Sequence, residues 1–225
     1  MQTERCSTCL KPESLCLCRE IQALATQTHV LILQHPQEPN ENLGTARLAH
    51  LALSNSTLKI GLSWPNLNKA LGREVQASKW AVLYLGSGIK KDPTQKDQTP
   101  SKANSKPTST TAAGSLQFIS RQGTPAPRPE SIEGVVILDG TWSQAKALWW
   151  RNAWLLKLKR AVLLPQRKSL YRHLRKEPRP ECLSTIESIS ETLTALGEPA
   201  TVSQALDKLF QTLLEKYQAG RKKQN

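Results

Sequence analysis

The chain has 225 residues, enough for one substantial α/β core with a small module added to it. Lys and Arg number 31 against 18 Asp and Glu, so the formal net charge is +13 and the calculated pI is about 9.8, which favours a polyanionic partner. The lack of an apolar run of about 18 residues excludes a membrane-spanning helix, and Met1–Arg5 lack the features of a secretory signal. We therefore expect a protein of the reducing cytoplasm.

Four of the five cysteines lie close together near the start of the chain. Cys6 and Cys9 have the spacing of a zinc knuckle, and Cys16 and Cys18, two apart in an extended segment, would point to the same side. We predict that residues 1–25 form a small module in which all four bind Zn²⁺. Four protein ligands leave no position for a reactive water, so the site would be structural. The alternative is two redox-sensitive pairs or unbound thiols.

Residues 26–85 predict the first half of an α/β core. Apolar runs predict strands over residues 29–34, 58–62 and 80–85, and helical spacing predicts a helix over residues 45–53. The inward positions of that helix are Leu48, Leu51 and Ala52.

His35-Pro36-x-Glu38 follows the first predicted strand, and Pro36 forces His35 into an extended conformation. On physical grounds alone, a structural histidine is as consistent with this position as a functional one.

Residues 90–131 differ in composition from the rest of the chain. They lose apolar content, carry six prolines and are rich in Ser, Thr and Lys. This composition predicts a disordered insertion or a mobile loop.

Residues 134–150 combine a buried strand with a helix start. Val135 to Leu138 form an apolar run with no polar face, and Gly140 allows a tight turn before a pattern with helical spacing. Asp139 and Thr141 therefore lie where open α/β sheets place their ligand sites. The alternative is that both residues merely cap the helix and that Trp142 is core.

The remaining chain predicts one strand and two helices. The strand covers residues 161–164, Ser184 and Glu187 fit a capping box, and an apolar stripe marks the last helix. The stripe consists of Val202, Leu206, Leu209, Leu213 and Tyr217. Strands alternating with helices predict a mostly parallel sheet with helices on both faces, in one domain over residues 26–220.

Basic residues concentrate in residues 151–185, which contain ten Lys and Arg residues but only two Glu residues. Surfaces usually mix charges of both signs, so this stretch predicts a phosphate-binding face. We expect Arg167, Arg172 and Arg175 to contact RNA.

Several motifs occur together in the order in which the DTW-domain family carries them. They are Cys6-x-x-Cys9 with Cys16-x-Cys18, His35-Pro36-x-Glu38, Asp139-Gly140-Thr141-Trp142, Leu163-Leu164-Pro165 and Leu183-Ser184-Thr185-x-Glu187. The chain thus resembles this family of tRNA-uridine aminocarboxypropyltransferases, which is related to the knotted SPOUT class of RNA-modifying enzymes.

The resemblance implies a SPOUT-like fold with a C-terminal trefoil knot that holds S-adenosylmethionine. It also implies tRNA as partner, in a monomer or a homodimer. The implied cofactor-binding residues are Tyr84, Leu85, Gly86, Ser87, Leu163, Leu164, Pro165, Leu183, Ser184 and Thr185. It favours a substrate or cofactor role for His35 and Glu38, with Arg47 as a partner for Glu38 or for phosphate.

The implied reaction moves the 3-amino-3-carboxypropyl group of S-adenosylmethionine to N3 of a tRNA uridine. Asp139 is the candidate catalytic residue, either as the base for the N3 proton or as the group that orients the uracil. An ordinary aspartate is a weak base for an imide, so the orienting role is the simpler one. Trp142 either stacks on the uracil or packs in the core, and Thr141 can donate a hydrogen bond. Two alternative functions also have RNA as the ligand: a SPOUT-type methyltransferase and a non-catalytic zinc-containing RNA-binding protein.

Overall fold

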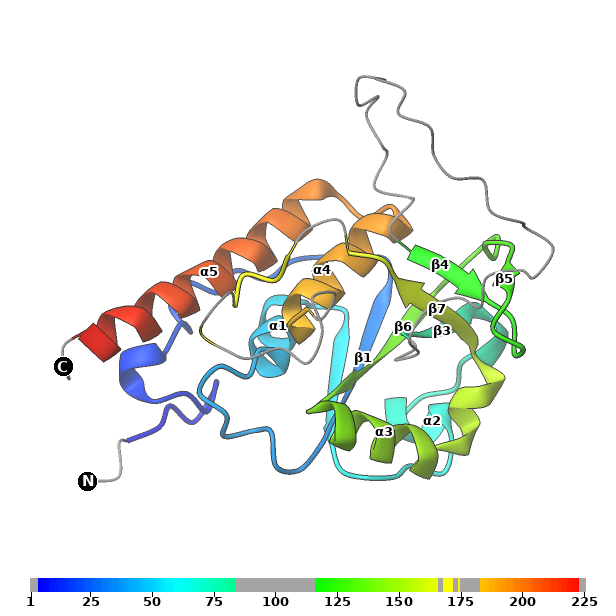
Figure 1. Cartoon of the computed structure of the whole chain (residues 1–225), viewed down its shortest axis with the longest axis horizontal. Helices are drawn as coiled ribbons and strands as arrows, with labels where there is room; N and C mark the ends of the chain where they lie inside the picture. Colours follow the sequence, from blue (N-terminus) through cyan, green and yellow to red (C-terminus); the bar gives the residue numbers. More distant parts are fainter. Residues whose placement is uncertain (1–3, 84–115, 166–167, 172–173, 175–182, 223–225) are drawn as a thin grey trace, which may run out of the picture.

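The computed structural model describes residues 4–83, 116–165, 168–171, 174 and 183–222. In this part of the chain, one seven-stranded sheet has the order β2-β1-β6-β3-β7-β4-β5 (Figure 1). The strands are β1 (His29–Gln34), β2 (Ser56–Ile60), β3 (Trp80–Leu83), β4 (Leu116–Ile119), β5 (Pro125–Ala126), β6 (Gly134–Asp139) and β7 (Lys159–Leu163). The strands from β2 to β7 in this order pair in parallel, so the predicted mostly parallel α/β sheet is confirmed.

The predicted strands match the observed ones most closely where both faces are covered. β1 has the predicted bounds and all six residues are buried. β2 begins and ends two residues earlier than the predicted strand over 58–62, because its partly exposed residues follow the register with β1 rather than an apolar run. β7 likewise begins two residues before the predicted strand over 161–164.

The prediction of a disordered insertion or mobile loop over residues 90–131 is wrong for its second part. β4 pairs antiparallel with β7, and β5 pairs antiparallel with β4. Leu116, Phe118 and Ile119 are buried in this pairing. Residues 90–115 lie outside the described part of the chain.

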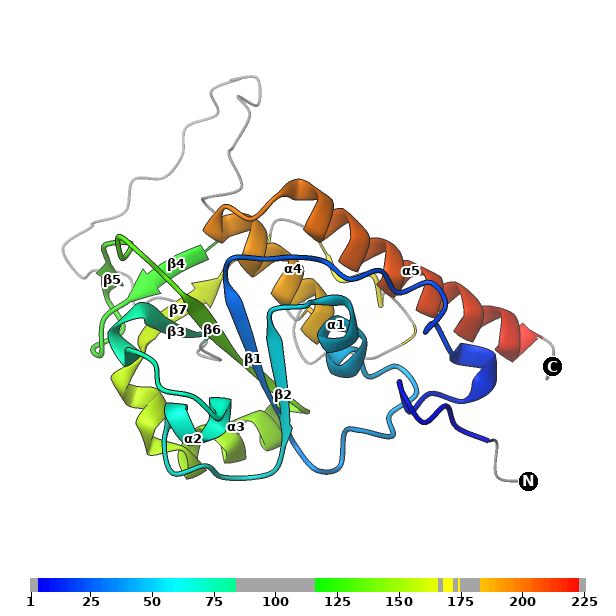
Figure 2. The same cartoon turned by 180° about the vertical axis from the view of Figure 1, so that it is seen from behind.

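Helices cover both faces of the sheet, as predicted (Figures 1 and 2). They are α1 (Ala46–Ala52), α2 (Leu67–Leu71), α3 (Trp142–Arg151), α4 (Thr185–Leu196) and α5 (Ala200–Lys222), with short 3-10 turns η1 (Glu13–Leu15), η2 (Ala77–Lys79) and η4 (Ala153–Lys157). Alternate residues of β1 enter two cores, since Val30 and Ile32 pack with α1, α4 and α5 whereas Leu31 and Leu33 pack with α2 and α3. The predicted stripe of α5 is confirmed, with Tyr217 partly buried and the other four residues buried.

The sheet has its topological switch at β1 and β6. These neighbouring strands end together, with Gln34 opposite Asp139. The chain leaves β1 for β2 on one side and leaves β6 for β7 on the other, so the loops after the two strands diverge. In open α/β sheets a ligand crevice forms where neighbouring connections part in this way.

Two further observations bear on the predicted fold. None of the helices in the described residues is long and apolar enough to span a membrane. Most of the chain between Leu174 and α4 lies outside the described residues, so the trefoil knot stays a prediction.

Gly134 begins β6 against the buried indole of Trp80. A Cβ atom at residue 134 would lie 2.5–2.6 Å from three ring atoms of Trp80. We expect Gly134→Ala to lower the free energy of unfolding by about 1–3 kcal/mol, because the fully buried ring must shift. Urea unfolding would measure this loss. The control is Gly220→Ala in α5, where nothing lies within 4 Å of an added Cβ, and where alanine should be neutral or stabilising. Equal effects of the two substitutions would contradict the prediction.

Candidate functional site

Asp139 lies at the carboxyl end of β6 and is 6% exposed. Gln34 Nε2 donates a 2.8 Å hydrogen bond to Asp139 Oδ2, and the Thr185 hydroxyl donates a short one to Oδ1. The carboxylate is therefore held by side chains from β1 and from the start of α4. These three residues are far apart in the sequence, and the sheet and α4 bring them together.

Gly140 and Thr141 turn the chain from β6 into α3. A Cβ atom at residue 140 would lie 2.9 Å from Gln144 Cβ, and the backbone φ of 157° also favours glycine. Thr141 caps α3 in a capping box with Gln144, which confirms the predicted cap. Trp142, the first residue of α3, is half-buried.

The loop after β1 lies beside this turn. The His35 backbone N–H donates to the Asp139 carbonyl at 2.9 Å, and Gln37 Oε1 accepts a 3.0 Å hydrogen bond from Gln144 Nε2. Glu38 is buried, and its backbone N–H donates to the His35 carbonyl. The predicted residues His35 and Glu38 thus lie in the loop after β1, which is bonded to the turn that follows Asp139.

Glu187 fixes the start of α4, on the other side of Asp139 from the loop after β1. Its fully buried carboxylate accepts hydrogen bonds from the Ser169 hydroxyl, from the Leu170 backbone N–H, and from both the backbone and the side chain of Ser184. This confirms the predicted capping box, and the same carboxylate also holds residues 169–170 against the start of α4. Thr185 is thereby fixed in the position from which it reaches Asp139.

The other predicted cofactor-binding residues lie at the same edge of the sheet where the structure describes them. Leu163 ends β7, Leu164 and Pro165 follow it, and α4 contacts both β6 and β7. Leu183 and Ser184 precede α4 directly. The predicted residues Tyr84, Leu85, Gly86, Ser87, Arg167, Arg172 and Arg175 lie outside the described part of the chain.

The four predicted metal ligands form one cluster. All Sγ atoms of Cys6, Cys9, Cys16 and Cys18 lie within 4.8 Å of one another. The Sγ atoms of Cys6 and Cys18 are 3.7 Å apart, and those of Cys9 and Cys16 are 3.8 Å apart. A tetrahedral site with metal–sulfur bonds of about 2.3 Å requires sulfur atoms about 3.8 Å apart. The cluster therefore has the size that a bound metal ion needs.

The pKa values of the cysteine thiols are also consistent with a bound cation. Hydrogen bonds from the backbone N–H groups of Cys9 and Thr8 lower the pKa of the Cys6 thiol to about 6. Burial and the neighbouring thiols raise the pKa of Cys18. The Cys6 thiolate therefore forms more readily than that of a free cysteine, whereas the Cys18 thiolate is favoured by a positive charge beside it.

Two basic residues tie the cysteine segment to the loop before α1 and to α1 itself. Lys11 is 2% exposed, and its ammonium donates to the carbonyls of Glu41 and Gly44, at 2.7 and 2.5 Å. Burial lowers the pKa of Lys11 to about 8. Arg47, which was predicted as a partner for Glu38 or for phosphate, donates to the Thr8 carbonyl at 3.5 Å and so contacts the cysteine segment.

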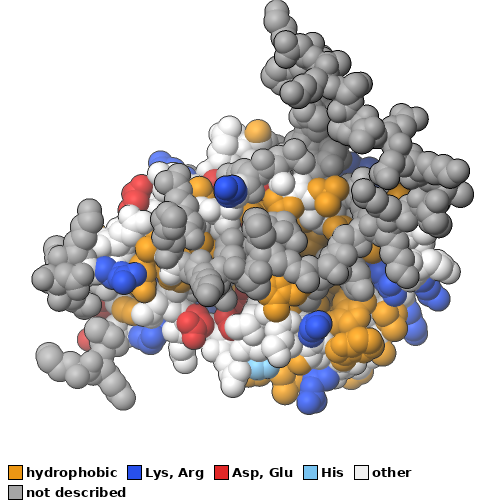
Figure 3. All heavy atoms as spheres, in the orientation of Figure 1, with side chains coloured by type: hydrophobic (Ala, Val, Ile, Leu, Met, Phe, Trp, Pro, Cys, Tyr) orange, Lys and Arg blue, Asp and Glu red, His pale blue; other side chains and the backbone are white. Residues whose placement is uncertain are grey.

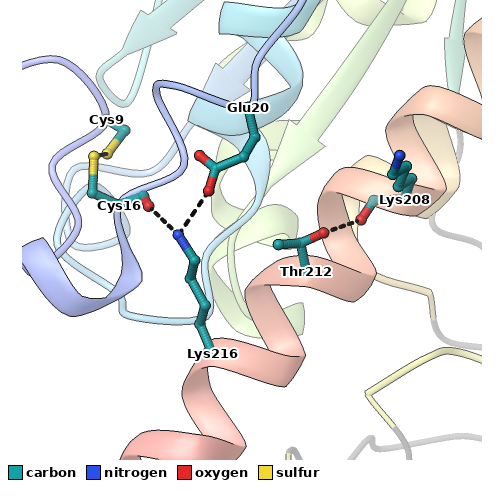
Figure 4. Close-up of polar contacts among 6 residues, drawn as sticks. All are labelled: Cys9, Cys16, Glu20, Lys208, Thr212 and Lys216. Atoms are coloured by element: carbon teal, nitrogen blue, oxygen red, sulfur yellow. Dashed lines mark hydrogen bonds and ion pairs between the residues drawn. The ribbon is translucent and has the colours of Figure 1, made fainter.

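Helix α5 holds the cysteine segment from the other side (Figure 4). Lys216 Nζ donates to the Cys16 carbonyl at 2.8 Å and pairs with Glu20 Oε1 at 2.9 Å. Cys9, Leu15 and Leu17 also enter the same core as α1, α4 and α5. The cysteine segment is thus packed onto the face of the sheet that carries α4.

Gln34 and Lys11 are the two site residues that the sequence analysis missed. Gln34 is 2% exposed, and its Oε1 is buried without a hydrogen-bond partner within the described residues. The available signal was a polar residue at the end of an otherwise apolar strand, directly before His35-Pro36. Lys11 carried no such signal, because a lysine between cysteines is usually exposed.

Residues 3–218 match the model of the family described as DTW domain. The chain belongs to this family. Its DTW domain contains the Asp139 carboxylate, the loop after β1 and the four-cysteine cluster in one continuous match.

Curated proteins that are similar to this chain are named tRNA-uridine aminocarboxypropyltransferases. A protein of Macaca fascicularis named tRNA-uridine aminocarboxypropyltransferase 2 is 29% identical over 213 residues, which cover 92% of this chain and 61% of the relative. The Drosophila melanogaster protein of the same name is 27% identical, over 95% of this chain and 74% of the relative. The Arabidopsis thaliana tRNA-uridine aminocarboxypropyltransferase A is 25% identical, over 85% and 72%. The chain thus spans about 61% of the length of the Macaca relative, and no solved structure matches it.

Proposed function

We propose that this protein transfers the 3-amino-3-carboxypropyl group of S-adenosylmethionine to N3 of a uridine in tRNA. The observation that carries the proposal is the Asp139 carboxylate, held by Gln34 and Thr185 at the switch point of a DTW domain. The names of the relatives support the substrate and the transferred group. The positive net charge of +13 supports a polyanionic substrate.

The segments around Asp139 offer binding groups for the donor. The loops at Leu163–Pro165 and Leu183–Thr185 offer backbone groups at the edge where α4 begins. Glu187 accepts two hydrogen bonds from Ser184 in the second of these loops and two more from Ser169 and Leu170, so this loop is preorganised. When bound, S-adenosylmethionine supplies an activated carbon next to its sulfonium and leaves as methylthioadenosine.

Asp139 holds the imide of the uracil. Gln34 donates to one carboxylate oxygen and Thr185 to the other, and a carboxylate oxygen can accept more than one hydrogen bond, so the uracil N3–H group can act as a further donor. An ordinary ionised aspartate is a good hydrogen-bond acceptor but a weak base for an imide. The N3–C bond forms as the carbon–sulfur bond of the donor breaks, while Asp139 orients the base, and the N3 proton becomes acidic as the new bond forms. The proton then passes to Asp139 and from there to water.

Thr141 and Trp142 complete the uracil site. Thr141 uses its oxygen as the helix cap, so its hydroxyl proton can be donated to a uracil carbonyl. Trp142 is half-buried on the first turn of α3 and can stack on a base that is turned out of its RNA strand. His35 and Glu38 close the site from the loop after β1.

The four cysteines would hold a structural Zn²⁺. The spacing of their Sγ atoms and the lowered pKa of Cys6 support this assignment. With four thiolate ligands, the ion would fix the shape of the cysteine segment and supply no reactive water. Lys11 and Lys216 would transmit that rigidity to the loop before α1 and to α5.

Nucleoside mass spectrometry tests the reaction. Unmodified tRNA incubated with the purified protein and S-adenosylmethionine should gain the mass of a 3-amino-3-carboxypropyl group on uridine, with one methylthioadenosine released for each group transferred. A methylated uridine together with S-adenosylhomocysteine would instead assign a methyltransferase. An unchanged tRNA that still binds tightly would assign an RNA-binding protein without this activity.

Gln34 provides a test of how Asp139 is positioned. We expect Gln34→Leu to lower kcat about tenfold or more, because the buried Asp139 Oδ2 loses the hydrogen bond from Gln34 and the carboxylate is less firmly oriented. The dissociation constant for tRNA should stay within about twofold, since one buried amide contributes little to binding a polyanion. Steady-state kinetics and filter binding measure the two quantities. The control is Gln37→Leu, which removes an exposed contact to Gln144 and should leave kcat nearly unchanged. A normal kcat in Gln34→Leu would show that Asp139 needs no such support.

A further inference from the structure

Helix α3 presents one exposed face along its length. Its inner residues Ala145 and Leu148 are buried against the sheet, whereas Ser143, Lys146 and Trp150 are exposed. These three lie three and four residues apart, so they share one face of the helix. Trp150 is 78% exposed, the highest value among the large apolar side chains of the described residues. A tryptophan in that position contributes almost nothing to the core.

Trp150 sits on a firmly held corner of the molecule. Asn152, which is fully buried, donates to the Leu62 carbonyl at 3.0 Å and accepts from the Trp64 backbone N–H at 2.8 Å. Ser63 also donates to the Arg151 carbonyl at 3.0 Å. The end of α3 is thereby bonded to the loop after β2, so the exposed indole projects from a rigid base.

The exposed face of α3 begins beside the Asp139 site and extends away from it along the helix. α3 begins directly after the turn that follows Asp139, and Trp150 lies nine residues beyond Thr141. At about 1.5 Å per residue, this places the indole roughly 13 Å further along the helix axis. A strand of RNA with one base at Asp139 could therefore reach Trp150 with a base a few nucleotides away.

The charge around Trp150 identifies the class of partner. The sequence between Asp139 and Glu177 contains no acidic residue, and Lys146, Arg151, Lys157 and Lys159 are all exposed there. Figure 3 shows hydrophobic side chains gathered at the lower right, over α3 and the segment after it, with Lys and Arg side chains around them. Pairing this face with a second copy of itself would bring like charges together. An aromatic ring among cations instead suits a nucleic acid, whose bases stack on the ring while phosphates contact the cations.

We propose that the outer face of α3 is an RNA-docking surface on which Trp150 stacks against an unpaired base of the tRNA, a few nucleotides from the modified uridine. Lys146 and Arg151 contact the phosphates on either side of that base. The choice of tRNA as the ligand rests on the proposed function, whereas the surface itself can be tested by binding alone.

The test is filter binding of unmodified tRNA to the full-length protein, without S-adenosylmethionine and at fixed salt. Trp150→Ala should weaken binding about tenfold, and Trp150→Phe should restore most of the loss, because a phenyl ring still stacks. Leu156→Ala is the matched control, since Leu156 is apolar and 42% exposed but has no ring. Its affinity should equal that of the native protein. Unchanged melting temperatures would confirm that all three variants fold.

Three results would overturn the proposal. They are native affinity in Trp150→Ala, equal losses in Trp150→Ala and Trp150→Phe, and equal losses in Trp150→Ala and Leu156→Ala. Sedimentation gives a further check, because a native dimer that becomes monomeric in Trp150→Ala with unchanged tRNA affinity would make this face a contact between copies. If tRNA gains no group from the native protein but Trp150→Ala still binds it weakly, the proposed reaction fails and the docking surface stands.

Discussion

Replacing Asp139 with alanine should abolish transfer to tRNA while leaving tRNA binding nearly intact. In the proposed reaction the carboxylate orients N3 and receives its proton, and such groups typically contribute about a hundredfold to ten-thousandfold to the rate. We therefore expect kcat to fall about a thousandfold. The dissociation constant for tRNA should change by less than about twofold, because one carboxylate adds little to binding by a basic protein. Single-turnover transfer of a labelled group and filter binding measure the two effects.

Glu133→Gln is the control for this experiment. Glu133 lies directly before β6, whereas Asp139 ends it, so the two carboxylates lie at opposite ends of one strand. Glu133 pairs with Lys79 at 2.7 Å in an exposed position, where an ion pair contributes less than about 1 kcal/mol. The variant should keep full activity. Loss of tRNA binding together with normal turnover in Asp139→Ala would assign Asp139 to the docking of RNA rather than to the reaction.

The parallel core of the fold could be predicted because strands that are buried on both faces appear in the sequence as continuous apolar runs. β1 and β6 are apolar throughout except at their ends, and both were predicted nearly to the residue. β4 was missed because its four residues follow a stretch rich in Pro, Ser and Thr, and only its pairing with β7 makes it a strand. A short antiparallel strand at a sheet edge carries too little local pattern to be recognised.

The site was predictable as a set of motifs but not as a set of contacts. The sequence placed Asp139 at a strand end, the family resemblance implied a cofactor contact for Thr185, and the structure joins the two residues by a hydrogen bond. No spacing rule could have paired them, because α4 reaches β6 only through tertiary packing. Gln34 was missed for the same reason, since its role depends on the register that sets it opposite Asp139.

Removing the proposed zinc should have the second large effect, on both stability and turnover. The purified protein should hold about one Zn²⁺ per chain, and Cys16→Ser or a strong chelator should remove it. Structural zinc binding is worth about 10 kcal/mol or more in small zinc modules, so its loss should unfold the cysteine segment. Lys11 would then lose its fixed position at the carbonyls of Glu41 and Gly44. Metal analysis, calorimetry and limited proteolysis near the N-terminus measure these steps.

The activity should fall with the metal because the cysteine segment supports the loop before α1. That loop is held to the Asp139 site by two contacts, from the Tyr171 hydroxyl to the Leu43 carbonyl at 2.6 Å and from the Ile186 backbone N–H to Thr45 Oγ1 at 3.1 Å. Ile186 follows Thr185, so a displaced loop disturbs the donor to Asp139. Ser7→Ala, an exposed change between Cys6 and Cys9, should leave metal content, melting temperature and kcat unaltered. Metal-free protein with a normal melting temperature would instead identify the cysteines as free thiols or redox pairs, and an unchanged kcat after metal loss would uncouple the cluster from the reaction.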